Sequence, residues 1–220
     1  ITNPVINGEL DILMAGVQVP MFNVGFGFSG GVEFGDGEII VNHMDLFDQE
    51  GNQAYANMQI YHEDWGGFNY DVTLDMEDPS LSEKFLVMNT VYEEGSYYYG
   101  KAYISGLVNI FGYDELVQIT VDATTKKGTD LVLPLYGTSE LEETSFIKFT
   151  APKDTNAVQI IEEIERMGMT LDMKFHVTPD AQVTIVFEPV YGDQIVSRGQ
   201  GDIEIAMDDY GEMTMFGKYQ

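Results

Sequence analysis

Residues 168–188 read GMTLDMKFHVTPDAQVTIVFE, and the pattern of this stretch decides the fold class. From Leu171 to Val177 every second side chain is apolar, while Asp172, Lys174 and His176 lie between the apolar positions. In an extended strand a period of two sends alternate side chains to opposite faces. The stretch therefore predicts a β-strand with one apolar face and one polar face.

The same alternation continues to the end of the chain. Thr178-Pro179-Asp180-Ala181 interrupts it, because proline fixes φ and aspartate favours a turn. We expect four consecutive strands joined by tight turns, which form a meandering sheet with one apolar face. The residues of that predicted face are Leu171, Met173, Phe175, Val177, Val183, Ile185, Phe187, Ile203, Ile205, Met207, Met213 and Met215.

Strand patterns also fill the chain before residue 135. Phe68, Tyr70, Val72, Leu74 and Met76 alternate with polar residues over five positions, and Pro79 follows them. Gly35-Asp36-Gly37 lies between two apolar runs, which is a hairpin signal. Strands recur without intervening helices, so the chain is predicted to be one all-β domain over residues 1–220.

One segment has a helical period instead. Ala157, Ile160, Ile161 and Ile164 follow the i, i+3, i+4, i+7 spacing of a helix face, and Gly168 can end the helix. We predict one short helix over residues 154–167 that caps the sheet. A movable plug in a groove is the alternative role for this helix.

Charge and composition exclude several classes of function. The 220 residues carry a formal net charge of −27, which argues against nucleic acid as a partner and against docking on an anionic lipid surface. The acidic side chains are expected to solvate an outer face. Cysteine is absent, so thiol catalysis and disulfides are excluded. No apolar run approaches the roughly 20 residues of a membrane span. Ile1 begins no signal peptide, so we expect a mature, truncated or cytosolic chain.

The candidate catalytic, cofactor and metal motifs are weak. Gly25-Phe26-Gly27-Phe28-Ser29-Gly30 matches a dinucleotide fingerprint in its letters, but a strand pattern follows where the fingerprint needs a helix. His62-Glu63-Asp64 lacks the histidine spacing of a metalloprotease. Asp45, Asp48 and Glu50 lack the ligand pattern of an EF-hand. Asp202 and Glu204 share a strand face, but that face is the polar one. We expect no enzyme, no cofactor and no metal.

The remaining feature is the apolar face, for which the residues alone leave two interpretations. The face is either the ordinary core of two packed sheets or the lining of a groove for hydrophobic cargo. Most one-sided strands belong to sandwiches, so the pattern by itself favours the core.

Several segments resemble the C-terminal domain of TamB, the translocation and assembly module subunit related to the AsmA-like bridge proteins. They are residues 171–181 and Arg198-Gly199-Gln200-Gly201-Asp202-Ile203, with residues 85–90, 98–106 and 124–129 upstream. The resemblance runs from about Gly51 onward. It implies an elongated, U-shaped, taco-like sheet with an apolar concave face, and it implies that the chain is a piece of a longer protein.

The resemblance also implies a function. Such a domain is expected to be a non-catalytic periplasmic bridge or chaperone whose groove shields phospholipid acyl chains during transport between the membranes, or which assists outer-membrane protein assembly and secretion. Its partners would be phospholipid or other hydrophobic cargo and an outer-membrane β-barrel. The full-length protein would be anchored in the inner membrane of a Gram-negative cell. The alternative, from another class, is an extracellular β-sandwich adhesin or carbohydrate-binding module.

Overall fold

A computed structural model of the chain describes residues 6–93, 96, 98–113, 116–134, 168–188, 193–210 and 212–220. The described part is nearly all β-structure in a single open, curved sheet, which confirms the predicted fold class. The sequence alternative of two sheets packed face to face does not describe it. The predicted helix over residues 154–167 lies outside the described residues.

Fourteen strands and one short 3₁₀ helix, η1 (Pro20–Phe22), make up the described fold. The strands are β1 (Gly8–Val19), β2 (Val24–Gly35), β3 (Glu38–Phe47), β4 (Gln53–Glu63), β5 (Gly66–Asp75), β6 (Phe85–Thr90), β7 (Tyr99–Tyr113), β8 (Leu116–Thr125), β9 (Asp130–Pro134), β10 (Met169–Val177), β11 (Gln182–Glu188), β12 (Asp193–Ser197), β13 (Gly201–Met207) and β14 (Met213–Tyr219).

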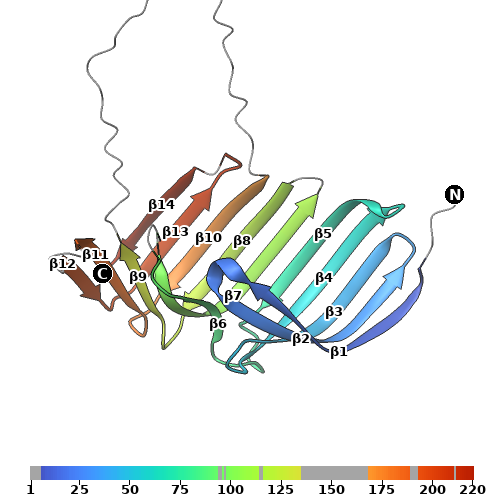
Figure 1. Ribbon diagram of the computed structural model, residues 1–220, viewed down its shortest axis with the longest axis horizontal. Coiled ribbons are helices and arrows are strands. Elements are labelled where there is room, and N and C mark those ends of the chain that lie inside the picture. The colour runs from blue at the N-terminus through green and yellow to red at the C-terminus, as the bar shows by residue number, and fades with distance from the viewer. Residues whose placement is uncertain are drawn as a thin grey trace, which may run out of the picture.

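Ten of these strands form the main path of the sheet, in the order β1-β2-β3-β4-β5-β7-β8-β10-β13-β14. Figure 1 shows them side by side as a long, curved row. Neighbours along the path are antiparallel except for β8 and β10, which are parallel. At a spacing of about 4.8 Å, ten strands extend for roughly 43 Å from the first to the last.

Bulges interrupt the ladders near the beginning of the chain. The register shifts between Ile12 and Ala15 in the β1–β2 pair, and between Val41 and Met44 in the β3–β4 pair. His43, inside the second shift, has φ 57°, a left-handed value that is uncommon outside glycine. A bulge bends its strand and increases the local twist, so these shifts help the sheet to curve.

The other four strands form a smaller leaf beside one edge of the main path. β7 is the longest strand: its C-terminal part pairs with β5 and β8, and its N-terminal part pairs with β6 and β9. β9 then pairs in parallel with β11, which pairs with β12. In Figure 1 β9, β11 and β12 lie at the left, and β6 lies below the middle of the main row.

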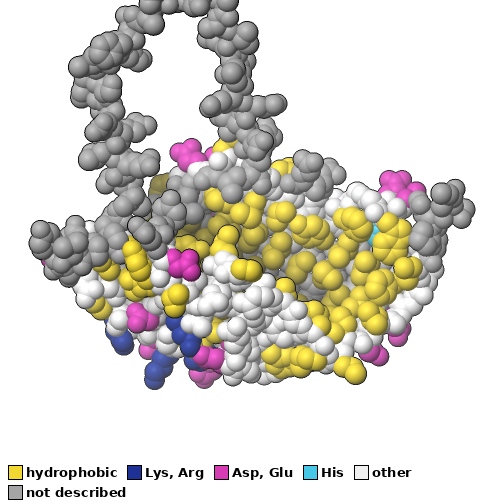
Figure 2. All heavy atoms as spheres, in the orientation of Figure 1, with side chains coloured by type: hydrophobic (Ala, Val, Ile, Leu, Met, Phe, Trp, Pro, Cys, Tyr) yellow, Lys and Arg dark blue, Asp and Glu magenta, His cyan; other side chains and the backbone are white. Residues whose placement is uncertain are grey.

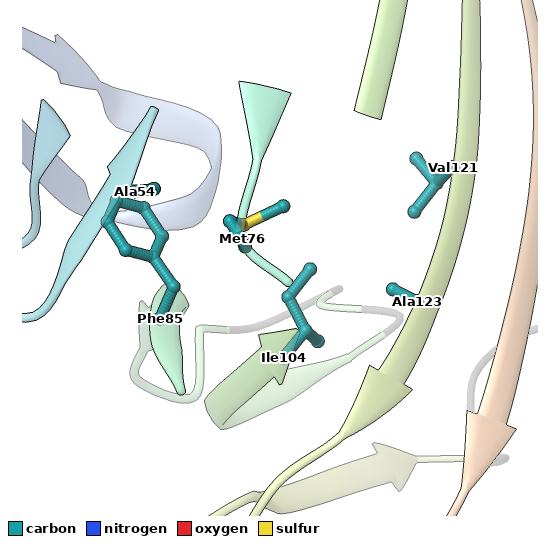
Figure 3. Packing of buried hydrophobic residues seen from close by; sticks show 6 residues of the cluster. All are labelled: Ala54, Met76, Phe85, Ile104, Val121 and Ala123. Atoms are coloured by element: carbon teal, nitrogen blue, oxygen red, sulfur yellow. The ribbon is translucent and has the colours of Figure 1, made fainter. Parts of the chain in front are cut away.

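The largest cluster of buried hydrophobic residues in the described part of the chain lies where the leaf meets the main sheet. Phe85 of β6 and Ile104 of β7 pack with Ala54, Met76, Val121 and Ala123, as Figure 3 shows. The Phe85 ring stacks on Phe26 of β2, with centroids 5.4 Å apart. The packed leaf therefore closes the sheet along the edge where β4 begins and β8 ends.

A buried carboxylate holds β6 in that position. Asp48, in the turn between β3 and β4, is 6% exposed and accepts the backbone N–H of Leu86 at 2.7 Å. It also accepts hydrogen bonds from Glu50 and Asn52 of its own turn. Asp48 is one of three acidic residues weighed above as calcium ligands, and in the fold its oxygens accept backbone and amide N–H groups.

The order of the C-terminal strands differs from the predicted meander. β10 does not pair with β11, the next strand in sequence, but with β8 and β13. The edge of β8 is free to accept β10 because β9 turns away after Thr125 and joins β7 instead. Alternation identifies the faces of a strand, but it carries no information about which edge the strand meets.

Candidate functional site: an apolar trough

Two rows of directly paired residues cross the main sheet on the face that carries Leu171, Met173 and Phe175, here called the inner face. Every side chain in both rows is apolar. The first row is Val41, Met58, Val72, Ile110, Ile119, Leu171 and Met207, and the second is Met44, Ala56, Leu74, Val108, Val121, Met173, Ile205 and Met215. The inner face is thus continuous from β3 to the last strands.

This face is hollowed rather than packed flat. Figure 2 shows hydrophobic side chains spread across a concave surface. Many residues of the two rows, such as Met58, Ile110 and Leu171, are only half-buried. Apolar side chains of a folded core are normally covered completely, so a long, half-exposed apolar face has the character of a binding surface. We call it the trough.

Burial changes along the strands, from one strand end to the other. We call the row of buried strand ends the closed edge of the trough, and the row of half-exposed strand ends its open edge. On β4 the inner residues Ala54 and Ala56 are 0% and 8% exposed, whereas Met58 and Ile60 are half-buried. β10 has the same gradient, because Val177 is buried and the preceding inner residues are half-buried. The closed edge lies against the leaf, and the open edge lies at the β2–β3 and β4–β5 turns, where β7 ends and β8 begins.

The outer face is polar, as the alternation predicts. On β10 it carries Asp172, Lys174 and His176, all exposed. The Nδ1 of His176 lies 2.6 Å from a carboxylate oxygen of Asp202 on β13, and its Nε2 lies 3.3 Å from Asp122 on β8. The hydrogen bond to Asp202, with the charges of both carboxylates, raises the pKa of His176 above its usual value. The imidazole thus links three neighbouring strands from outside.

A second polar cluster lies where the leaf meets the β3–β4 turn. The Tyr103 hydroxyl lies 2.7 Å from both carboxylate oxygens of Glu50, and Lys101 pairs with the same carboxylate. The Nζ of Lys84 lies 3.7 Å from the centre of the Tyr103 ring, as in a cation–π contact. The hydrogen bond from Lys101, followed by that from Tyr103, lowers the pKa of Glu50. The cluster fastens the N-terminal part of β7, which pairs with the leaf strands β6 and β9, to the β3–β4 turn.

The weak motifs of the sequence take structural positions. Gly25 to Gly30 lie inside β2, with a strand on each side. Asp202 and Glu204 lie on the outer face of β13, opposite His176 and Lys174. Within the described ranges, no group of three or more His, Asp or Glu side chains has the geometry of a metal site. The same ranges include no helix that is long and apolar enough to cross a bilayer.

Nine of the predicted groove residues belong to strands that line the trough. Those on β10 and β13 pair side by side, for example Phe175 with Ile203 and Met173 with Ile205. Met213 and Met215 lie on β14, the last strand of the path. The nine are Leu171, Met173, Phe175, Val177, Ile203, Ile205, Met207, Met213 and Met215.

The other three predicted residues, Val183, Ile185 and Phe187, lie on β11. This strand is outside the ten-strand path and pairs with β9 and β12. Their alternation resembles that of β10, but the Thr178–Ala181 turn leads the chain into the leaf.

Comparison with known families agrees with the geometry of the trough. The TamB C-terminal domain matches residues 43–220, from within β3 to the end of β14. The chain belongs to the TamB C-terminal domain family. The match includes the leaf and the trough strands from β4 onward. No match was found among curated proteins or among solved structures.

Membership in the TamB family carries a general statement of function and place. The chain is part of a TamB-type bridge or assembly system, and it belongs to the envelope of a Gram-negative cell. The translocation and assembly module is therefore the functional context in which its trough is to be understood.

The predicted groove residues all lie on β10 or later strands, although β3 to β8 supply much of the lining of this TamB domain. Met58, Leu74, Val108 and Val121 all belong to the second row or lie beside it. The signal was present in the alternation from Phe68 to Met76, which places Val72 and Leu74 on one face. Alternation within one strand does not show that the apolar faces of strands far apart in the sequence join into one surface.

Proposed function

We propose that this TamB-family domain is a non-catalytic periplasmic bridge whose trough shields phospholipid acyl chains from water during transport between the inner and outer membranes. The single observation that carries the proposal is the uninterrupted apolar inner face, paired residue by residue across the sheet. A full-length protein anchored in the inner membrane would extend the same screen across the periplasm.

The energetics suit acyl chains. Each methylene group kept from water contributes about 0.8 kcal/mol, so a chain of about 16 carbons gains on the order of 12 kcal/mol. An unpaired charge in the path would cost several kcal/mol and would interrupt the transfer. Both rows of the trough meet this requirement, because their side chains are apolar from Val41 to Met207 and from Met44 to Met215.

The charge distribution supports the same role. With 37 acidic residues among 220, the outer face can stay solvated while the inner face holds the cargo. The proposal includes no catalytic residue, cofactor or metal. It also includes no nucleic-acid partner, because a net charge of −27 repels phosphate backbones.

A second candidate function is assistance in the assembly of outer-membrane proteins. The observation that favours it is the edge strand β14, which pairs with β13 on one side and exposes Met215 and Phe216 at 57% and 66%. The unpaired backbone N–H and C=O groups of an edge strand can form hydrogen bonds with another strand, which then extends the sheet. A nascent strand or a partner β-barrel of the outer membrane would be the ligand of that edge.

Lipid analysis of the purified protein tests the first proposal. An organic extract should contain phospholipid by mass spectrometry, at an amount that tracks the protein concentration. Phe175→Asp places a charge on the inner face between Ala123 and Ile203, so it should lower retained phospholipid strongly. The matched variant is His176→Asp, one residue further on and on the outer face, which should retain lipid as the wild type does. Equal retention by the two variants, with both folded by circular dichroism, would contradict the proposal.

A further inference from the structure

The turn between β4 and β5 has an unusual backbone. Glu63 pairs with Gly66, so the connection consists of only two residues, Asp64 and Trp65. Both have positive φ, 53° and 63°. A two-residue hairpin with left-handed central residues is the type in which Asn-Gly or Asp-Gly is strongly preferred. Asp64 fits the first position, but a bulky tryptophan at the second is an outlier.

Ring contacts hold the tryptophan in this conformation. The imidazole of His62 stacks on the Trp65 ring, with centroids 4.4 Å apart and planes inclined by 23°. The Nδ1 of His62 accepts the backbone N–H of Trp65 at 3.3 Å, and the Phe68 ring lies 5.6 Å from the imidazole. The backbone N–H of His62 donates to the backbone carbonyl of Gly37 in the neighbouring β2–β3 turn. We call His62, Trp65 and Phe68 the rim cluster.

The rim cluster continues the lining of the trough at its open edge. Ile39, Ile60 and Tyr70 are paired across β3, β4 and β5 on the inner face, and His62 and Phe68 follow Ile60 and Tyr70 toward the turn. The ring of Tyr70 occupies the space that a side chain at Gly112 would need. Phe68 is 41% exposed, and Trp65 is half-buried. Along β4 the inner face thus passes from fully buried Ala54 to a partly exposed aromatic end.

This gradient matches the two ends of an amphipathic lipid. Tryptophan and tyrosine concentrate at the level of lipid headgroups in membranes, because one part of each ring is apolar and the other can hydrogen-bond. At the closed edge Ala54, Phe85 and Ile104 belong to one buried apolar cluster. A fatty acyl end fits the closed edge, and a glycerol ester region fits the aromatic edge.

We propose that the rim cluster is a binding site for the glycerol ester and headgroup end of a phospholipid held in the trough, whose acyl ends point toward Phe85. The proposal rests on the lipid-shielding function proposed above and adds the orientation of the lipid and the residues that contact its polar end. The strained turn places the Trp65 ring at the rim, where a glycine turn would leave a gap.

Trp65 is the only tryptophan of the chain, so its fluorescence reports on this site alone. The full chain is titrated with phosphatidylcholine that carries a nitroxide either on the headgroup or near the end of an acyl chain. We expect a blue shift of the emission on lipid binding, and stronger quenching by the headgroup label than by the chain-end label. Stronger or equal quenching by the chain-end label would overturn the proposed orientation, and an unchanged emission with lipid bound would overturn the site.

Two variants separate this role from a structural one. Trp65→Gly gives the preferred Asp-Gly turn, so the melting temperature should stay equal or rise while the retained phospholipid falls. Asp64→Gly relaxes the neighbouring position and keeps the ring, so it should retain lipid as the wild type does. Wild-type retention by Trp65→Gly would overturn the rim site and leave the lipid-shielding function standing, whereas a wild-type protein without any lipid would overturn both.

Discussion

Asp48 joins the leaf to the main sheet, and its replacement by alanine is the sharpest test of how the closed edge is held. The carboxylate is 6% exposed. One oxygen accepts the backbone N–H groups of Glu50 and Asn52, both at 2.8 Å. The other accepts the Asn52 side-chain amide and the N–H of Leu86, both at 2.7 Å. Leu86 is 1% exposed, so water cannot replace the carboxylate there.

The expected loss follows from these bonds. Leaving the buried Leu86 N–H without an acceptor costs about 1–3 kcal/mol, and losing the charge-assisted bonds within the turn costs about 1.5–3 kcal/mol more. The N–H of exposed Glu50 can turn to water, which offsets part of that sum. Asp48→Ala should therefore lower the free energy of unfolding by about 3–5 kcal/mol, a large part of the roughly 5–15 kcal/mol of a typical domain.

Urea unfolding measures this loss, and hydrogen exchange at the Leu86 amide locates it. In Asp48→Asn the side-chain carbonyl oxygen can still accept the N–H groups of the turn, but the amide NH2 would face the donors Asn52 and Leu86. We therefore expect a loss of unfolding free energy about half as large as for Asp48→Ala. The control is Asp78→Ala, because Asp78 accepts its bonds from Ser80 within its own loop. A loss no larger for Asp48→Ala than for Asp78→Ala, or unchanged exchange at Leu86, would refute the reasoning.

Two smaller effects complete the predictions. The pKa of His176 is raised by Asp202 and Asp122, so its ion pairs stabilise the fold fully below about pH 6.5 and are lost as pH rises through the raised pKa. Its side chain is 54% exposed, so we expect at most about 1 kcal/mol, and Asp202→Asn should reduce the difference in melting temperature between about pH 5.5 and about pH 9. An undiminished difference would assign the pH dependence to other groups. The Thr90 hydroxyl is buried and has no hydrogen-bond partner among the residues that the structure describes, so Thr90→Val should leave the free energy of unfolding unchanged or raise it by up to about 1 kcal/mol. A clear loss on calorimetry would mean that the hydroxyl is satisfied.

Much of the local structure could be predicted from single stretches of sequence. The period of two over Leu171–Val177 identified a strand, and it separated an apolar from a polar face correctly, because His176 meets Asp202 and Asp122 outside while Phe175 meets Ala123 and Ile203 inside. The same period over Val183, Ile185 and Phe187 also identified a strand. That strand, β11, pairs with β9 and β12 outside the ten-strand path, which alternation alone does not indicate.

The rim cluster was beyond such reasoning for a different reason. Glu63-Asp64-Trp65-Gly66 has no Asn-Gly or Asp-Gly at its centre, so the sequence signalled no two-residue hairpin there. His62 was weighed as a metal ligand, whereas in the fold its ring packs on Trp65 and Phe68. Only the paired strands bring these rings to one edge.

The sequence by itself therefore determined the class of fold and the polarity of each strand face, because side-chain alternation is a local property. Tertiary structure alone decided that β10 lies between β8 and β13, that β6 closes one edge through Asp48, and that the apolar faces of distant strands join into one trough. The physical reason is that strand pairing depends on backbone hydrogen bonds, which are the same for every sequence, so the partner is selected by which edges remain free and which faces can be buried together.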